Sequence, residues 1–403
     1  MARKQLLALF ICNLTPYLIG NSLLPLLPFY VRQKGAGAGI TGIYLALAFG
    51  ALTAGTLAGG WLAGKTIRRK ATIAASASLA SLALVLMGVV GHLVGLVVAI
   101  VICWFVCGVQ LATVSILTGA LASAGRRGVV FGVVGSSLAM GGLIAGLFAG
   151  RVVDRWGFDA LFAGLAVVVL VPAVVAQGLA VPRGAAVPVR TRHQGIAAVT
   201  HPAIWLLLGA STLAYVSHFM GGLGRPLAMG QLGFDSTAIS STGAIAGAVN
   251  LPLPFLIGWL SDRVGRRPLL VLCYLAGAAG VGSVLVASSL WHFWTSQVFS
   301  AVLGVSLSVG PALMADMVPE EARSASLARF AATPWLGGVV GYAGAGAVIE
   351  TAGLAAALSV GLLLPLGSVL LVMLGRTARP VPTPDALKRT TTTLAVATAA
   401  PGR

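Results

Sequence analysis

Two copies of a short glycine- and arginine-rich segment lie half a chain length apart, and each copy stands between two long apolar runs. Residues 258–268 have the sequence GWLSDRVGRRP, and residues 60–70, which lie 198 positions upstream, have the sequence GWLAGKTIRRK. A charged hairpin that recurs after half the chain is typical of a duplicated membrane protein. The chain is therefore predicted to consist of two related halves.

The composition indicates a chain that lies within lipid. Hydrophobic residues make up 58% of it and charged residues 9%, and the mean hydropathy is +0.98. A soluble fold of this composition would lack a polar surface. The 403 residues accommodate about a dozen spans of 20–25 residues with short connections, and they leave no room for a large soluble domain.

Six apolar runs precede the middle of the chain and six follow it, which predicts an all-α membrane protein with twelve transmembrane helices in two six-helix bundles. The predicted spans are residues 5–31, 41–63, 71–91, 93–122, 128–150, 158–181, 203–229, 237–259, 268–290, 292–318, 324–349 and 353–375. The predicted domains are an N-terminal bundle over 1–181, a linker over 182–202, a C-terminal bundle over 203–375 and a disordered tail over 376–403. The first run is too long and too rich in proline for a signal peptide, so it is predicted to remain as the first helix.

The net charge of +17 reports the topology of the chain. All but five of the 26 lysines and arginines fall in segments that lie on one side of the membrane in this topology. The five exceptions are Arg32, Lys34, Arg151, Arg155 and Arg225. The positive-inside rule therefore predicts that both termini and the linker face the cytoplasm, with the chain in a bacterial inner membrane. The basic charge indicates affinity for anionic lipid headgroups and argues against nucleic acid as a partner.

The sequence does not contain the residue patterns of metal sites, nucleotide-binding sites or hydrolase active sites. The four cysteines lie within apolar runs, and the five histidines are scattered without ligand spacing, so no metal site and no cofactor is predicted. The sequence holds neither a phosphate-binding loop nor a nucleophile elbow, so nothing in it supports an ATP-driven pump or a membrane enzyme. We expect a monomer whose partners are the lipid bilayer and a small-molecule substrate.

The internal repeat extends beyond the opening segments. The further pairs are Tyr17 with Tyr215, Pro28 with Pro226 and Gly35 with Gly233, each 198 positions apart, and Asp154 with Glu350 and Gly157 with Gly353, each 196 apart. Chance alignment of glycine-rich apolar sequence explains the glycines but does not explain the tyrosine, proline and acid matches. The two halves are therefore predicted to share the same fold.

The second copy of the hairpin carries a family signature made of a glycine, an aspartate–arginine pair, a glycine and a basic pair. These residues are Gly258, Asp262, Arg263, Gly265, Arg266 and Arg267. Through them the chain resembles the major facilitator superfamily over nearly its whole length. The resemblance implies a central cavity lined by helices 1, 4, 7 and 10, and rocking of one half against the other. The fifth span also resembles part of the glycine–proline motif of drug:proton antiporters, through Ser137, Gly141, Gly142, Ala145 and Gly146.

The repeated hairpin is predicted to take part in gating. Gly60 and Gly258 permit a tight turn and the close approach of a neighbouring helix, and Asp262 can form a latch that exists in one state only. A simpler role as a topology anchor is the alternative, and it suits the first copy, where Gly64 replaces the acid. In the fifth span, Gly142, Gly146 and Gly150 share one helical face and predict a close-packing seam.

The spans carry no carboxylate near their middle. The nine acids are Asp154, Asp159, Asp235, Asp262, Asp316, Glu320, Glu321, Glu350 and Asp385. An organic cation in a cavity of low dielectric constant would lack a counter-charge. We therefore expect neutral or anionic substrates.

The seventh span carries a polar stripe on one helical face, formed by Ser211, Tyr215, His218, Gly222 and Arg225 at spacings of four, three, four and three residues. His218 is the candidate for proton coupling because it is the one mid-span group that titrates near neutral pH. A structural hydrogen bond to a neighbouring helix is the alternative for His218. For Arg225 the alternatives are anion binding and snorkelling of its side chain to the interface.

Uncharged polar residues in other spans are further candidates for substrate binding. They are Asn13, Tyr17, Asn21, Gln110, Thr113, Asn250, Gln297 and Ser308. Each could instead form a hydrogen bond between helices.

Together these features predict a secondary active transporter that exports small amphipathic neutral or anionic compounds by alternating access, with protons as the candidate coupling ion. The alternative is an importer or uniporter of an organic anion or a sugar-like solute. A non-transporting receptor or lipid-handling protein on the same fold would show no saturable solute flux.

Overall fold

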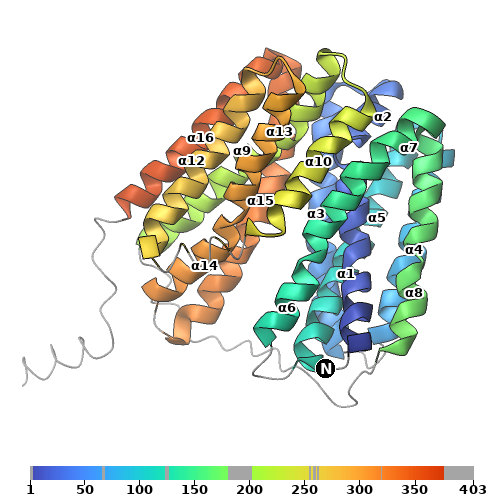
Figure 1. Ribbon diagram of the computed structural model, residues 1–403, viewed down its shortest axis with the longest axis horizontal. Coiled ribbons are helices and arrows are strands. Elements are labelled where there is room, and N and C mark those ends of the chain that lie inside the picture. The colour runs from blue at the N-terminus through green and yellow to red at the C-terminus, as the bar shows by residue number, and fades with distance from the viewer. Residues whose placement is uncertain are drawn as a thin grey trace, which may run out of the picture.

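The computed structural model describes residues 3–65, 69–122, 127–179, 202–253, 256, 260, 263–318 and 320–375. All regular secondary structure within these ranges is helical (Figure 1). The helices are α1 (Arg3–Leu23), α2 (Leu27–Gln33), α3 (Ala38–Lys65), α4 (Arg69–Val89), α5 (Leu93–Leu121), α6 (Arg127–Gly135), α7 (Ser137–Val168), α8 (Val171–Val175), the short 3-10 helix η2 (Ala176–Gly178), α9 (Pro202–Gln231), α10 (Ser236–Asn250), α12 (Arg266–Leu285), α13 (Leu290–Gly304), α14 (Ser306–Met317), α15 (Glu320–Ala352) and α16 (Leu354–Leu374).

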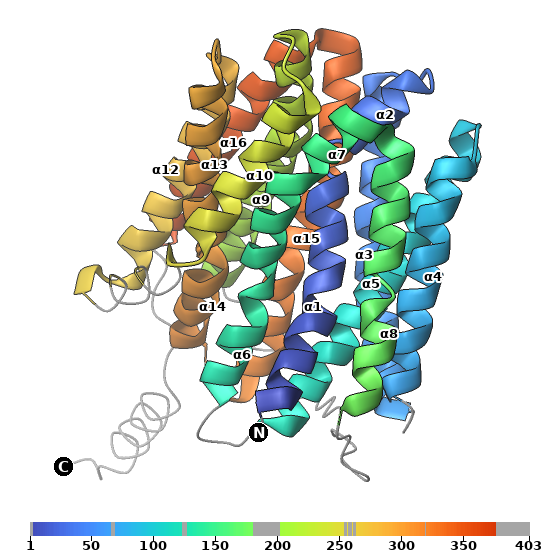
Figure 2. The ribbon, with the colours of Figure 1, turned by 45° about the vertical axis from the view of Figure 1, so that its right-hand side comes forward.

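Helices α1–α8 lie on one side of the molecule and helices α9–α16 on the other, and most run along the same long direction (Figures 1 and 2). The two ends of this bundle are given separate names below. The basic end is the end at which α1 begins and α16 finishes, and the opposite end is the end that holds α2 (Figure 2). The two groups of helices are called the N-terminal half and the C-terminal half below.

Ten stretches of the described residues are long and apolar enough to cross a membrane. One of them, Gly128–Gly178, has 51 residues and contains a reversal of the chain at Gly157, so that it passes along the molecule twice (Figure 2). Helix α10 has 15 residues, and much of the chain between Asn250 and Arg263 lies outside the described residues. The protein is therefore an all-helical membrane protein, and the count of twelve helices remains a prediction.

Several of the predicted spans are interrupted, among them the first, the fifth and the tenth. The run over 5–31 consists of α1 and α2, which are separated by a turn that contains Pro25, a residue that cannot donate a backbone hydrogen bond. The run that begins at residue 128 is divided between α6 and α7 at Ser136, whose hydroxyl donates to the carbonyl of Val133 at 2.8 Å. The run over 292–318 is divided between α13 and α14 at Val305.

Two pairs of repeat-related glycines adopt the same left-handed conformation. Gly35 and Gly233 have φ angles of 86° and 78°, and Gly157 and Gly353 have φ angles of 80° and 88°. A side chain with a Cβ atom rarely adopts this region, so each turn requires glycine. The two halves therefore repeat the backbone geometry of these turns as well as their sequence.

One seam between the halves joins α7 to α10 through small residues. A Cβ atom on Gly146 or Gly150 would overlap the backbone of α10 at Ala244 or Ser236. The hydroxyl of Ser240 on α10 accepts from the backbone N–H of Gly150 at 3.1 Å and lies 3.2 Å from the carbonyl of Gly146. The close-packing face predicted in the fifth span thus lies against the other half of the molecule.

A second seam joins α3 to α15. A Cβ atom on Gly346 would lie 2.8 Å from the carbonyl oxygen of Ala38 and 2.8 Å from the Cα of Gly42. Further along, the ring of Phe49 on α3 packs against the rings of Phe219 and Tyr342, with centroid distances of 4.7 and 5.2 Å. Backbone contact at the glycines and aromatic packing at Phe49 hold these helices together.

A carboxylate from each half caps the first turn of a helix in the other half. On α7, Asp154 accepts from the backbone N–H groups of Ser236 at 3.1 Å and Thr237 at 2.8 Å, and from the hydroxyl of Thr237 at 2.6 Å. On α15, Glu350 accepts from the N–H of Gly39 at 3.1 Å. Asp154 and Glu350 are repeat partners in the sequence, and Gly39 and Thr237, which are 198 positions apart, are each the second residue of their helix.

These contacts between the halves share one location. Helix α7 approaches the opposite end between Gly142 and Asp154, α10 begins there, α3 begins there, and α15 finishes there. Within the described ranges, the hydrogen bonds that join the two halves all lie between the middle of the molecule and the opposite end. The halves are therefore closed against each other at the opposite end.

Candidate substrate site

A cavity of about 210 Å³ lies where the end of α1 meets the C-terminal half. Its walls come from α1 and the turn after it, and from α9, α10, α13 and α15. The lining residues are Asn21, Leu24, Pro25, His218, Phe219, Gly222, Arg225, Thr242, Gly243, Ala246, Asn250, Gln297, Ser300, Ala301 and Tyr342. The resemblance implied that the fourth predicted span, which is α5, lines the cavity. None of the lining residues belongs to α5, whereas α10 and α15, which are not among the helices that the resemblance implied, both contribute.

The polar stripe on α9 is divided between structural contacts and the cavity. Nearer the basic end, the hydroxyl of Ser211 lies 2.7 Å from that of Thr333, and the hydroxyl of Tyr215 lies 3.1 Å from that of Ser306. These bonds tie α9 to α15 and α14. The remaining members of the stripe, His218, Gly222 and Arg225, line the cavity.

His218 lies at the middle of α9 and is partly exposed to the cavity. Its ring contacts those of Tyr215 and Phe219 edge to face, with centroid distances of 6.0 and 5.1 Å. Among the described residues, no hydrogen bond joins the imidazole to a neighbouring helix. The interhelical hydrogen bond that was the alternative role for His218 is absent from this part of the structure.

Arg225 also faces the cavity, and a neutral amide holds its guanidinium. The side-chain oxygen of Gln297 on α13 accepts from Arg225, and the Nε2 of Gln297 donates to the backbone carbonyl of Thr242 on α10 at 3.2 Å. Gln297 is 7% exposed. Snorkelling to the interface is therefore not the arrangement of Arg225 in this structure, because its side chain lines an internal space.

The candidates on α1 and α5 nearer the basic end form structural bonds outside the cavity. Asn13 donates to the hydroxyl of Ser137 at 2.8 Å, and Gln110 donates to the carbonyl of Cys12 at 2.8 Å. Thr113 donates to a carbonyl of its own helix. All three candidates are buried.

The other uncharged candidates differ in position. Asn21 lines the cavity while its amide donates to the carbonyl of Tyr17 at 2.8 Å, and Asn250 lines the cavity from α10. The side chain of Tyr17 packs against Gly141 on α7. Ser308 is exposed and does not line the cavity.

The predicted gating hairpin is described only in part, because Gly258 and Asp262 lie outside the described residues. Among the described residues, no atom lies within 4 Å of a Cβ placed on Gly60, and the close approach predicted at this glycine stays a prediction because much of the hairpin lies outside these residues. Gly265 has a φ of 89° and precedes α12, and Arg263 is exposed.

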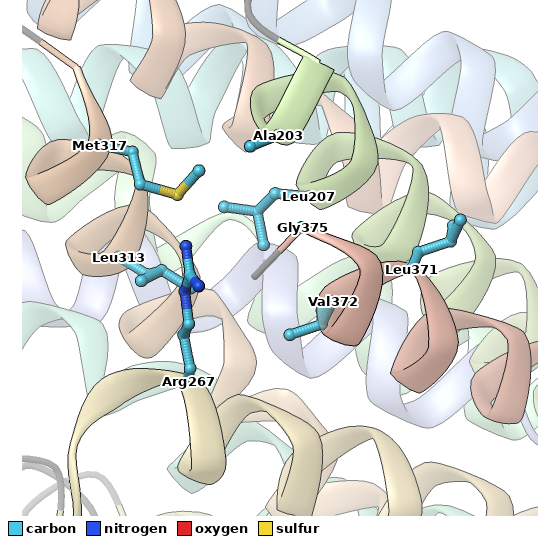
Figure 3. Close-up of a pocket in the computed structure, with 8 residues that line it drawn as sticks. All are labelled: Ala203, Leu207, Arg267, Leu313, Met317, Leu371, Val372 and Gly375. Atoms are coloured by element: carbon cyan, nitrogen blue, oxygen red, sulfur yellow. The ribbon is translucent and has the colours of Figure 1, made fainter. Parts of the chain in front are cut away.

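The basic pair of the hairpin lies against residues of the C-terminal half. Arg266 forms an ion pair with Asp316 and donates to the carbonyl of Ala312 at 2.7 Å. Arg267 points into a small space among Leu207, Leu313, Met317 and neighbouring apolar side chains (Figure 3). That space has a volume of about 10 Å³, room for at most one water molecule, so it is not a ligand site.

Aromatic and backbone elements of the cavity did not stand out in the sequence. Phe219 and Tyr342 lie in its wall, and the carbonyl of Thr242 orients Gln297. Aromatic residues in an apolar span give no signal of their own, since they suit lipid contact and helix packing equally. The hydroxyl of Ser306, which pairs with Tyr215, also gives no signal of its own, because a lone serine in a span can bond within its own helix or to any neighbouring one.

Curated relatives share short stretches of this sequence. The chain is 33% identical over 69 residues to the tetracycline resistance protein, class E, of Escherichia coli, which is 17% of this chain and 17% of that protein. It is 29% identical over 107 residues to the lysosomal dipeptide transporter MFSD1 of Homo sapiens, which is 26% of this chain and 22% of that protein. The chain thus spans less than a quarter of the length of these relatives.

Solved structures share the fold over almost the whole chain. The nucleoside transporter NupG superposes with a TM-score of 0.76 at 14% identity, covering 94% of this chain and 99% of that one. A bacterial homologue of the human lysosomal transporter Spinster, in an inward-facing and occupied conformation, also superposes with a TM-score of 0.76 at 14% identity, covering 94% and 98%. The model of the Major Facilitator Superfamily matches residues 9–224 and 207–400. With that match over nearly the full length, the chain belongs to the Major Facilitator Superfamily and is a membrane transporter, not an enzyme.

Proposed function

We propose that this transporter exports small amphipathic neutral or anionic compounds, and that the cavity between α1 and the C-terminal half is its substrate site. The observation that carries this proposal is the charge of the cavity wall. Arg225 is its one permanently charged group, and the amides of Asn21, Asn250 and Gln297 supply neutral hydrogen-bonding groups, with no carboxylate among the lining residues. An organic cation would be repelled by Arg225 and would find no counter-charge in the wall. An anion would be attracted to Arg225, and a neutral compound needs no counter-charge.

Efflux pumps among the partial relatives support export. One of them is the efflux pump FUB11 of Gibberella fujikuroi, which is 34% identical to this chain over 106 residues. The matched stretch covers 25% of this chain and 18% of that pump. The second candidate is an importer of an organic anion or a sugar-like solute. His218 and Arg225 line one cavity, and an anion beside Arg225 would also favour a protonated His218. Cooperative binding of an anion and a proton suits symport better than antiport.

We place the basic end in the cytoplasm of a bacterial inner membrane, together with both termini, the linker over 182–202 and the tail over 376–403. The excess of lysine and arginine in these segments supports this orientation. With twelve helices in two six-helix bundles, over 1–181 and 203–375, closure at the opposite end is closure toward the periplasm. The structure then corresponds to the inward-facing state of an alternating-access cycle.

Two groups of contacts would hold this state. The glycine seams let the backbones of the two halves touch, and Asp154 and Glu350 neutralise the partial positive charge at the first turns of α10 and α3. Both must separate when the transporter opens to the periplasm, since each joins one half to the other. We therefore propose Asp154 and Glu350 as a pair of repeat-related periplasmic latches.

The proposed substrate class predicts the outcome of a flux panel. In proteoliposomes, neutral and anionic amphipathic compounds should show saturable flux, whereas organic cations of similar size should not exceed the flux through protein-free liposomes. An imposed pH gradient should accelerate flux if protons are the coupling ion. Saturable flux of the cations would contradict the proposal, and uptake that follows an inward proton gradient would select the importer.

The proposed coupling role of His218 predicts that His218→Gln removes the response to a pH gradient while downhill flux continues. Glutamine keeps a polar side chain in the cavity but cannot change charge. Flux of one panel substrate is measured with and without the gradient for wild type, for His218→Gln and for His292→Gln, a histidine at the start of α13 whose Nδ1 bonds to Ser289. An unchanged gradient response in His218→Gln would assign the coupling to another group.

A further inference from the structure

Arg225 holds its charge in the cavity without a counter-ion. Its guanidinium donates to the amide oxygen of Gln297, and the one ion pair among the described residues joins Arg266 to Asp316 at the basic end. A cation inside a membrane protein is stabilised chiefly by a partner of opposite charge. Nothing in the described cavity wall supplies that charge, which leaves it to a ligand.

Gln297 orients the guanidinium of Arg225 through a hydrogen bond. The carbonyl of Thr242 can only accept, so the NH₂ group of Gln297 must face Thr242 and its oxygen must face Arg225. One guanidinium N–H is thereby occupied by a neutral group, and the positive charge is retained. A glutamate of nearly the same shape at position 297 would neutralise Arg225 from within the protein.

An aromatic wall belongs to the same cavity. Phe219 and Tyr342 both line it, and their ring centroids lie 5.3 Å apart at an angle of 52°. Phe49 of the N-terminal half packs against both rings and holds them in place. The volume of about 210 Å³ lies below the roughly 300–1,000 Å³ of sites for drug-sized ligands, so the occupant is small.

We infer that the cavity selects small aromatic monoanions of the aryl carboxylate class, and that Gln297 is a positioning residue that presents Arg225 to the carboxylate. This inference rests on the proposed function and narrows its substrate class. The carboxylate takes the free N–H groups of Arg225, and the ring of the ligand packs against Phe219 and Tyr342. A neutral analogue keeps the aromatic contact and loses the charge-assisted hydrogen bonds.

The test measures binding to the purified full-length protein by isothermal titration calorimetry with four probes: benzoate, benzamide, cyclohexanecarboxylate and benzylammonium. Benzoate should bind at least about tenfold more tightly than benzamide, and about three- to tenfold more tightly than cyclohexanecarboxylate. Benzylammonium should not bind. Benzamide affinity equal to that of benzoate would overturn the anion specificity, and equal affinity for the two carboxylates would overturn the aromatic requirement.

The positioning role is tested by the ratio of benzoate to benzamide affinity, which a merely structural role would not change. Gln297→Glu should lower this ratio at least about tenfold and retain benzamide binding, which also shows that the variant is folded. Gln177→Glu, the same substitution outside the cavity, should leave the ratio unchanged. A wild-type ratio in Gln297→Glu would overturn the role of Gln297. Flux of neutral panel compounds without benzoate binding would refute this inference alone, and benzoate binding without any flux would refute only the export function.

Discussion

Replacing Gly346 with alanine is expected to slow transport by about ten- to a hundredfold, because the closed seam at the opposite end has no room for a Cβ atom. The added atom would lie 2.8 Å from Ala38 O and 2.8 Å from Gly42 Cα, and both of these are backbone atoms that cannot move aside without separating α3 from α15. Overpacking of this kind costs about 1–3 kcal/mol, and the open state of the seam does not carry that cost. The equilibrium therefore shifts toward the state in which the opposite end is open, and closure of this seam becomes the limiting step.

Gly344 provides a matched control on the same helix. No atom lies within 4 Å of a Cβ placed there, so Gly344→Ala should transport within about twofold of wild type. The conformational shift is read as a distance distribution between spin labels on Lys34 and Trp291, which are exposed at the opposite end of the two halves. The four native cysteines are buried, which favours labelling at introduced sites. Equal flux and equal distances for the two variants would show that α3 and α15 do not separate during transport.

Removing both latch carboxylates is expected to raise the population of the substrate-free protein that is open at the opposite end by about tenfold. Asp154→Ala should contribute more than Glu350→Ala, because Asp154 accepts three hydrogen bonds from α10 and Glu350 accepts one from α3. Both carboxylates are exposed, so solvent screening keeps each effect well below that of a buried ion pair. The two seams are separate, and the two effects should therefore add on a free-energy scale.

The control for the latches is Asp159→Ala, an exposed acid on α7 for which no hydrogen bond to the other half is present among the described contacts. The same pair of spin labels reports the open population for the control, the two single variants and the double variant. A double variant with the distance distribution of the Asp159→Ala control would exclude the latches. A strongly non-additive double variant would show that the two seams open as one unit.

Some of this architecture could be predicted because its causes are local in sequence. Hydropathy identified membrane-crossing runs, and the left-handed turns at Gly157 and Gly353 require glycine wherever the chain folds in this way. Local sequence did not predict where every helix ends. The breaks at Ser136 and Val305 divide runs that are apolar throughout, and average hydropathy is insensitive to such breaks.

The candidate site shows that local sequence does not decide whether a polar side chain lines the cavity. Gln110 and Gln297 are both glutamines in apolar spans, yet Gln110 bonds to Cys12 and Thr15 on α1, whereas Gln297 lines the cavity and holds Arg225. Nothing in their local sequence distinguishes these two roles. The distinction depends on which helix stands opposite each side chain.

The sequence by itself determined that this protein is a helical membrane transporter with two related halves and no acid near the middle of its spans. Composition and helical period decide the helical membrane character, and both act between near neighbours in the chain. The relation of the halves follows from matched residues 196 and 198 positions apart, which a sequence shows without any knowledge of the fold. Only the tertiary structure decided that Asp154 caps α10 and that Arg225 meets Gln297, over sequence separations of 82 and 72 residues. A hydrogen bond requires its two atoms to lie within about 3 Å of each other, and helix packing alone brings such distant residues that close.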